Sequence, residues 1–138
     1  MGWNDDSFNQ EEEKSSYEKV PYGNYEVKVD KMETTTSKNS GRDMVKIWFK
    51  ILQGDYQDRI IFMNQVVERK FQRDILDKVL RGLVDDLPIV IKYESPRELY
   101  DLILDVFEEI SGKYEYGLKY DKDSKGYDTF KILEVFDA

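Results

Sequence analysis

A tryptophan flanked by lysines is the feature of this sequence with the clearest chemical potential. In the run Lys46-Ile47-Trp48-Phe49-Lys50, alternate residues of an extended chain share a face, so Lys46, Trp48 and Lys50 point the same way. An indole ring offers a flat surface on which an unpaired base can stack, and each such contact contributes about 1–3 kcal/mol to binding. The lysines would neutralise the neighbouring phosphates. The spacing therefore indicates a surface for single-stranded nucleic acid.

Other basic and aromatic residues extend this candidate surface. Some are expected on neighbouring strands, and others in the loop after the first strand or in the last hairpin. The candidate nucleic-acid-binding residues are Lys28, Lys38, Arg42, Lys46, Trp48, Lys50, Arg59, Tyr120, Lys122, Lys125 and Tyr127. The structural alternative is that a helical insert covers Trp48, which would make it a second-layer core residue with solubilising lysines. Tyr25 and Phe62 are expected in the core, and Tyr120 is expected to be the exposed member of a mostly buried tyrosine stripe.

The composition leaves few groups for catalysis. The 138 residues include no cysteine and no histidine, which excludes disulfides, Cys/His zinc sites, thiol nucleophiles and imidazole bases. The carboxylate pairs Asp5-Asp6, Asp85-Asp86 and Asp121-x-Asp123 could hold a divalent cation, but they fall where acidic residues cap helices and solvate turns. No phosphate-binding loop or nucleophile motif is present. We therefore expect no enzymatic activity, no metal and no cofactor.

The net charge of −8 is unevenly distributed along the chain. Residues 21–70 carry nine basic and seven acidic side chains, whereas residues 71–112 carry five and ten. An acidic total argues against a protein that coats duplex DNA by bulk charge, but it allows a local basic surface. The alternative is a chance excess on a solvated face. Residues 1–19 are predicted to form a flexible acidic arm. The arm is either a disordered leader or a segment that docks a partner or mimics an anionic ligand.

Hydrophobic periodicity predicts three strands first. Period-2 alternation favours strands at 25–30 and 44–51, with a third strand at 59–64 whose facing is ambiguous because Ile60 to Met63 are all apolar. The polar run Thr34–Gly41 is predicted to be a loop.

Two helices and a final hairpin are predicted to follow. Helical spacing covers 71–84, and a second helix begins at the capping box Ser95-Pro96-Arg97-Glu98 and ends near Gly112. The stretch 87–93 is compatible with a short strand or a buried connector. Strands are expected at 114–120 and 127–136.

This element order predicts one domain over residues 20–138, mainly β with a helical insert at 70–112 (α+β). Three strands, two helices and two strands match an OB-fold-like five-stranded Greek-key barrel with both helices between the third and fourth strands. The alternative is another α+β domain with a meander and a packed helix pair.

The turn residues carry a family resemblance. Pro21-x-Gly23-x-Tyr25 and Gly54-x-Tyr56-x-x-Arg59 resemble the phage-encoded single-stranded DNA-binding proteins with an OB-fold, a domain family catalogued as of unknown function. The sequence departs from that family at Asp58, where glycine is usual, and in its long second helix. The resemblance implies sequence-tolerant coating of single strands during phage or prophage replication or recombination, without catalysis.

A second hypothesis is a non-catalytic protein-interaction module that uses an OB-like barrel and an acidic helical face. Its partners would be replication or recombination proteins held by the acidic arm or the helices, and a homo-oligomer is compatible with the sequence. No apolar run approaches the roughly 18 residues that a membrane span needs, and no signal peptide is evident. We therefore expect no membrane association and a cytoplasmic location, in the bacterial host if the protein is phage-encoded.

Overall fold

The computed structural model describes residues 19–36 and 41–138, which form a five-stranded antiparallel sheet and two helices. The elements in chain order are β1 (Gly23–Thr36), β2 (Asp43–Ile51), β3 (Ile60–Val66), α2 (Lys70–Val84), α3 (Pro96–Ile110), β4 (Tyr114–Lys122) and β5 (Asp128–Asp137). The prediction of a mainly β, α+β fold with both helices between the third and fourth strands is confirmed. Neither of the described helices is long and apolar enough to cross a membrane.

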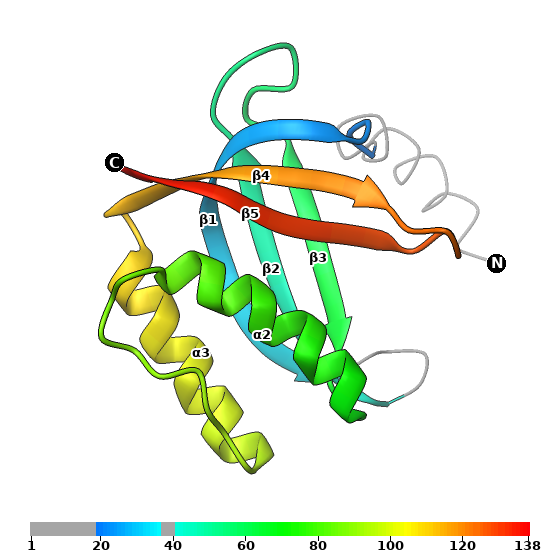
Figure 1. The fold of residues 1–138 in the computed structure, drawn as a ribbon, viewed down its shortest axis with the longest axis vertical. Helices are drawn as coiled ribbons and strands as arrows, with labels where there is room; N and C mark the ends of the chain where they lie inside the picture. The colour runs from blue at the N-terminus through cyan, green and yellow to red at the C-terminus, as the bar shows by residue number, and fades with distance from the viewer. Residues whose placement is uncertain (1–18, 37–40) are drawn as a thin grey trace, which may run out of the picture.

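The strand order is β3-β2-β1-β4-β5. The first half of β1 pairs with β4 and its second half pairs with β2, so Val27 has both Tyr116 and Ile51 as partners. Figure 1 shows β4 and β5 crossing β2, β3 and the second half of β1 at a steep angle. Within the described residues, no pairing joins β3 to β5, so hydrogen bonds do not close the sheet there.

β1 is longer than the sequence predicts and contains a bulge. The register shifts between Val29 and Lys31, so Lys28 and Lys31 both lie opposite outward-facing residues of β2. Thr34–Thr36 belong to the strand, which corrects the prediction of a loop from Thr34. The reason is that β-branched threonines suit a strand and pair there with β2 residues, which outweighs their turn propensity.

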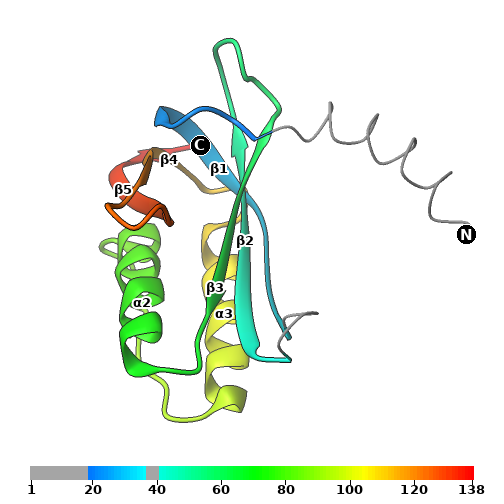
Figure 2. The same ribbon diagram turned by 90° about the vertical axis from the view of Figure 1, so that its right-hand side faces the viewer.

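The helices cover one face of the β1–β3 part of the sheet (Figure 2). The β2 residues on that face, Val45, Ile47, Phe49 and Ile51, are at most 1% exposed. On β3, Ile61 and Met63 are buried on the same face, which settles the facing that the sequence leaves open. The expectation that Phe62 lies in the core is wrong, because alternation places its side chain on the opposite face.

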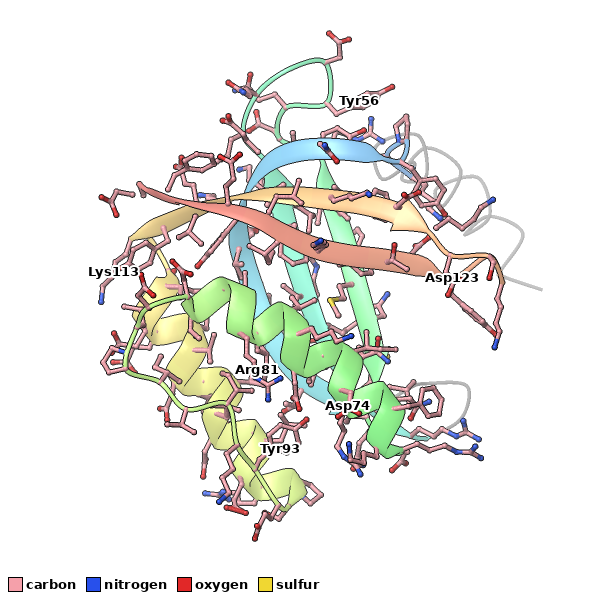
Figure 3. The ribbon with its side chains drawn as sticks, in the orientation of Figure 1. Tyr56, Asp74, Arg81, Tyr93, Lys113 and Asp123 are labelled. Carbon is pink, nitrogen blue, oxygen red and sulfur yellow. The ribbon has the colours of Figure 1, made fainter. Side chains whose placement is uncertain are left out.

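The second helix begins where the sequence predicts. The Ser95 hydroxyl accepts a hydrogen bond from the Glu98 N–H (3.1 Å), and the Glu98 carboxylate accepts one from the Glu94 N–H (3.1 Å). The connector between the helices has no regular secondary structure, but several of its apolar side chains pack against the core. Tyr93, labelled in Figure 3, donates a hydrogen bond to Asp77 of α2 (2.8 Å). The stretch 87–93 is therefore an irregular connector that is partly buried, with alternate residues packed against the core and Val90 76% exposed.

Two contacts fix α2 against the C-terminal strands. The buried Tyr116 hydroxyl donates to the Leu83 carbonyl near the end of the helix (2.7 Å). Gly82 lies so close to β5 that an added Cβ would be 2.7 Å from the Ile132 Cβ. Glycine at this position therefore allows the helix to approach the strand.

Candidate nucleic-acid interface

The face of β1, β2 and β3 that points away from the helices gathers lysines around two aromatic rings. In the strand register, Lys28 lies opposite Lys50, and Trp48 lies between Lys31 and Phe62. Lys46 occupies the same face two residues before Trp48. We define the outer face as Lys28, Lys31, Lys46, Trp48, Lys50 and Phe62.

Trp48 is half-buried at the centre of the outer face. Its ring centroid lies 6.1 Å from that of Phe62, with the planes at 69°. The Nζ atoms of Lys31 and Lys46 lie 5.0 and 5.5 Å from the indole centroid, within cation–π range. The helices pack on the other side of these strands (Figure 2), so the alternative in which they cover Trp48 is wrong.

Two ion pairs on the outer face are weak. Lys31 lies 3.5 Å from Glu33, and Lys50 lies 3.9 Å from Asp58. Exposed pairs of this kind contribute about 0–1 kcal/mol. Phosphate groups of a ligand can therefore replace these carboxylates at little energetic cost.

Two arginines of the candidate set lie away from Trp48, and Lys38 lies outside the described residues. Arg59 precedes β3, and its backbone carbonyl accepts a hydrogen bond from the Ile51 N–H (2.9 Å). Alternation therefore places Arg59 in phase with Ile61 rather than with Phe62. Arg42 is exposed just before β2, beyond the end of the outer face.

The expectation that Tyr120 is exposed is wrong. Its side chain is 4% exposed, and its ring stacks on Phe130 (5.5 Å, 24°) and packs against Tyr22 (4.9 Å). Its hydroxyl donates to Asp128 (3.3 Å), and burial raises the pKa of Tyr120 to about 12. A ring enclosed in this way offers no face to a base.

The remaining candidates lie in the β4–β5 hairpin, where Lys122, Lys125 and Tyr127 are exposed, Tyr127 by 69%. Figure 2 shows this hairpin on the helix side of β1–β3, so these three residues do not share the outer face.

The carboxylate pair of this hairpin serves the turn. Asp123, labelled in Figure 3, accepts hydrogen bonds from the backbone N–H groups of Lys125 (2.9 Å) and Tyr127 (3.0 Å). Over residues 19–36 and 41–138, no group of three or more acidic side chains could hold a metal ion.

Sequence reasoning missed Lys31 and misplaced Phe62. Strict alternation from Val27 and Val29 puts residue 31 on the core face, and only the bulge at Asp30 turns Lys31 outward. The one local sign of this bulge is that the apolar positions shift from Val27 and Val29 to Met32, which breaks the alternation. The facing of Phe62 follows from its pairing with Trp48, which the apolar run Ile60–Met63 does not encode locally.

A pocket of about 650 Å³ lies where β1 ends and β2 begins, beside the start of α3. Three carboxylate residues line it, Asp43, Glu68 and Glu94. Its one arginine, Arg73, donates to the backbone carbonyls of Val67 (3.0 Å) and Glu68 (2.8 Å). A cavity with this excess of negative charge repels phosphate, so it does not compete with the outer face as a nucleic-acid site.

Comparison with known proteins gives a family. Residues 6–83 match the family model described as protein of unknown function (DUF669). None of the curated proteins matches the chain. The matched segment covers more than half of the chain and contains all six residues of the outer face. The chain therefore belongs to the DUF669 family.

Proposed function

We propose that this protein binds single-stranded DNA through the outer face, without sequence preference and without catalysis. The observation that carries the proposal is the half-buried indole of Trp48, on the sheet face opposite the helices, with two lysine ammonium groups within 6 Å of its ring. A stacking platform beside cations is the common design of single-strand binding surfaces.

The charges suit a flexible single strand. Lys28 and Lys50 lie on one side of Trp48 along the strands, and Lys46 lies on the other. A strand whose base rests on the indole therefore meets positive charge on both sides, where its phosphates can be neutralised. Because the net charge of the whole chain is −8, repulsion from the rest of the molecule opposes binding. The contacts between lysines and phosphates should nevertheless make the affinity fall as the salt concentration rises.

The strand order supports an OB-fold as the architecture. With β1 between β4 and β2, the order 4-1-2-3 is that of a Greek key, and an OB-fold is a five-stranded Greek-key barrel that is partly open. The second and third strands of that fold carry oligonucleotides, and here they carry Trp48 and Phe62. The placement of the β4–β5 hairpin departs from this expectation, because that loop lies away from the outer face.

The resemblance to phage-encoded single-stranded DNA-binding proteins supports a role in phage or prophage replication or recombination. In that role the protein coats exposed single strands, and other proteins catalyse the reactions of replication or recombination. The outer face contains no catalytic constellation, and its lysines and rings bind phosphate and base surfaces that all sequences share.

The test is a binding titration with Trp48→Ala. Fluorescence anisotropy of a dye-labelled oligo-dT is measured at two salt concentrations with wild-type protein, Trp48→Ala and the control Tyr100→Ala, which removes an exposed ring from α3. We expect Trp48→Ala to lose about 1–3 kcal/mol of affinity, roughly 5- to 150-fold, with an unchanged circular dichroism spectrum. The control should bind as wild type does. Wild-type affinity in Trp48→Ala contradicts the proposal.

An exposed patch on α3 favours a second candidate, the protein-interaction module. Tyr100 and Leu104 are one turn apart and 45% and 50% exposed, and each is followed directly by an acidic residue, Asp101 and Asp105. Two results together would favour this function over DNA binding. The wild-type protein would not bind oligo-dT at low salt, and it would bind a replication protein that Leu104→Asp does not bind.

A further inference from the structure

Within residues 19–36 and 41–138, the strand at one end of the sheet lacks the usual protection of an edge. β3 reads Ile-Ile-Phe-Met-Asn-Gln-Val over Ile60–Val66, with no charged residue and no proline. Soluble proteins normally protect edge strands with charges, prolines, bulges or a covering element, because unpaired backbone groups recruit other strands. Over the described residues, no strand pairs with the outer side of β3, and Figure 2 shows no described element lying across it.

The hydrogen bonds around β3 show which backbone groups are available. The Ile51 N–H donates to the Arg59 carbonyl, and the Val67 N–H donates to the Asp43 carbonyl. Odd-numbered positions therefore bond to β2, and the alternation of an antiparallel ladder turns the N–H and C=O groups of Phe62 and Asn64 away from it. These groups point outward along the free edge of β3.

The opposite edge of the sheet is different. β5 carries a charged residue at four of its ten positions, Asp128, Lys131, Glu134 and Asp137. A register irregularity interrupts its pairing with β4, and α2 packs closely against it at Ile132. β5 therefore has the protections that β3 lacks.

We propose that β3 pairs with β3 of a second copy of this chain, antiparallel about a two-fold axis, to form a dimer with one continuous sheet. The same strand supplies both partners, so the outward N–H groups of Phe62 and Asn64 meet the outward carbonyls of Asn64 and Phe62 in the other copy. The Val66 carbonyl already accepts a hydrogen bond from the Gln65 side chain (3.0 Å) and takes no part in this pairing. No like charges oppose each other, because β3 has none. In a register centred on Met63, Phe62 of each copy pairs with Asn64 of the other. Asn64 lies opposite Lys46 and Phe62 lies opposite Trp48, so both side chains are on the side of the sheet that carries the outer face.

Such a dimer would double the outer face. A two-fold axis perpendicular to the sheet keeps both copies of Trp48 and Phe62 on the same side. The proposal does not depend on nucleic-acid binding, because the pairing uses backbone groups along the strand edge.

The experiment removes one outward N–H. Asn64→Pro deletes a donor that does not bond to β2, and proline is tolerated on an edge strand in this position. Asn64→Thr is the matched control, since it also changes the exposed side chain but keeps the N–H. Sedimentation velocity of full-length protein without nucleic acid, over a concentration series, measures the dissociation constant of the dimer.

Wild type and Asn64→Thr should form dimers with similar dissociation constants, and Asn64→Pro should weaken the dimer at least about tenfold. Urea unfolding of each variant checks that the monomer is intact. If Asn64→Pro does not fold, Asn64→Lys takes its place, because it sets lysines of the two copies close together at the edge. A wild-type protein that stays monomeric at the highest soluble concentration overturns the proposal. A dimer that is weakened by neither Asn64→Pro nor Asn64→Lys also overturns it.

The outcome is separable from that for DNA binding. Trp48→Ala should dimerise as wild type does, because Trp48 lies on β2 and takes no part in the edge. A monomeric protein that still binds oligo-dT would contradict the proposed dimer and leave the proposed DNA binding intact.

Discussion

Trp48 and Phe62 lie directly opposite each other on β2 and β3, with their rings edge to face and their centroids 6.1 Å apart. Aromatic pairs in this geometry contribute about 0.5–1.5 kcal/mol beyond the area they bury. Since the helices pack on the other side of the sheet, Phe62 is the ring that orients the indole on the outer face.

The pair should therefore be coupled in stability. Trp48→Ala, Phe62→Ala and the double variant form a cycle of unfolding free energies measured in urea, and we expect a coupling of about 0.5–1.5 kcal/mol. Phe62→Ala should also weaken oligo-dT binding, by less than Trp48→Ala does. Additive effects on the free energy of unfolding would show that the ring contact contributes nothing.

Lys31 should contribute to the salt dependence of binding. In Lys31→Gln, the slope of log K against log salt for oligo-dT should become shallower by about 0.7, the value for one phosphate contact on a single strand. Lys92→Gln, which removes an exposed lysine from the connector between the helices, should leave the slope unchanged. Equal slopes for wild type and Lys31→Gln would show that Lys31 makes no phosphate contact.

Gly82→Ala should destabilise the protein although alanine favours helices. The new Cβ would lie 2.7 Å from the Cβ of Ile132 and 2.9 Å from its Cγ1, so the helix or the strand must shift. Overpacking costs about 1–3 kcal/mol and the gain in helix propensity is roughly 1 kcal/mol, so we expect a net loss of up to about 2 kcal/mol in the free energy of unfolding. In an Ile132→Gly background, which removes the Cβ that the new methyl group would meet, Gly82→Ala should be neutral or stabilising. A loss of the same size in both backgrounds would exclude this clash as the cause.

The contact between Lys19 and Asp128 should make stability depend on pH in the acid range. Lys19 donates a hydrogen bond to Asp128 (2.9 Å), and so does the Tyr22 hydroxyl (2.6 Å). Burial raises the pKa of Asp128, but these hydrogen bonds and the charge of Lys19 outweigh it and hold the pKa below its ordinary value of 3.8. This stabilisation is complete above pH 3.8 and is lost as the pH falls through the lower pKa of the folded state.

Asp128→Asn tests this dependence. The variant should be less stable than wild type at pH 7, and the difference in the free energy of unfolding should shrink as the pH falls below about 4. A difference that stays constant from pH 7 to pH 2 would show that the ionisation of Asp128 contributes nothing.

The features predictable from sequence are those that depend on nearby residues. The start of α3 follows from Ser95, Pro96 and Glu98, three residues within one turn that make the observed cap. The facing of β2 follows from an uninterrupted alternation of apolar and polar residues, which places Trp48 away from the core. Its lysine neighbours Lys46 and Lys50 follow from the same alternation.

The features that escaped prediction depend on residues distant in the sequence. The bulge at Asp30, which brings Lys31 to Trp48, is set by pairing with β2. The facing of Phe62 depends on the same strand, and the burial of Tyr120 depends on Tyr22 and Phe130. No short window of sequence contains both members of these contacts.

The double pairing of β1 has a consequence for how the chain folds. The hairpins β1–β2 and β2–β3 join neighbouring segments, whereas Tyr25 meets Leu118, about 90 residues later in the sequence. The entropic cost of closing a loop grows only with the logarithm of its length, but pairings between distant segments still form more slowly than local ones. We therefore expect the meander of β1, β2 and β3 to form before the C-terminal hairpin pairs with β1. In a nascent chain that ends near residue 83, the first half of β1 has no β4 to pair with and is exposed to other strands.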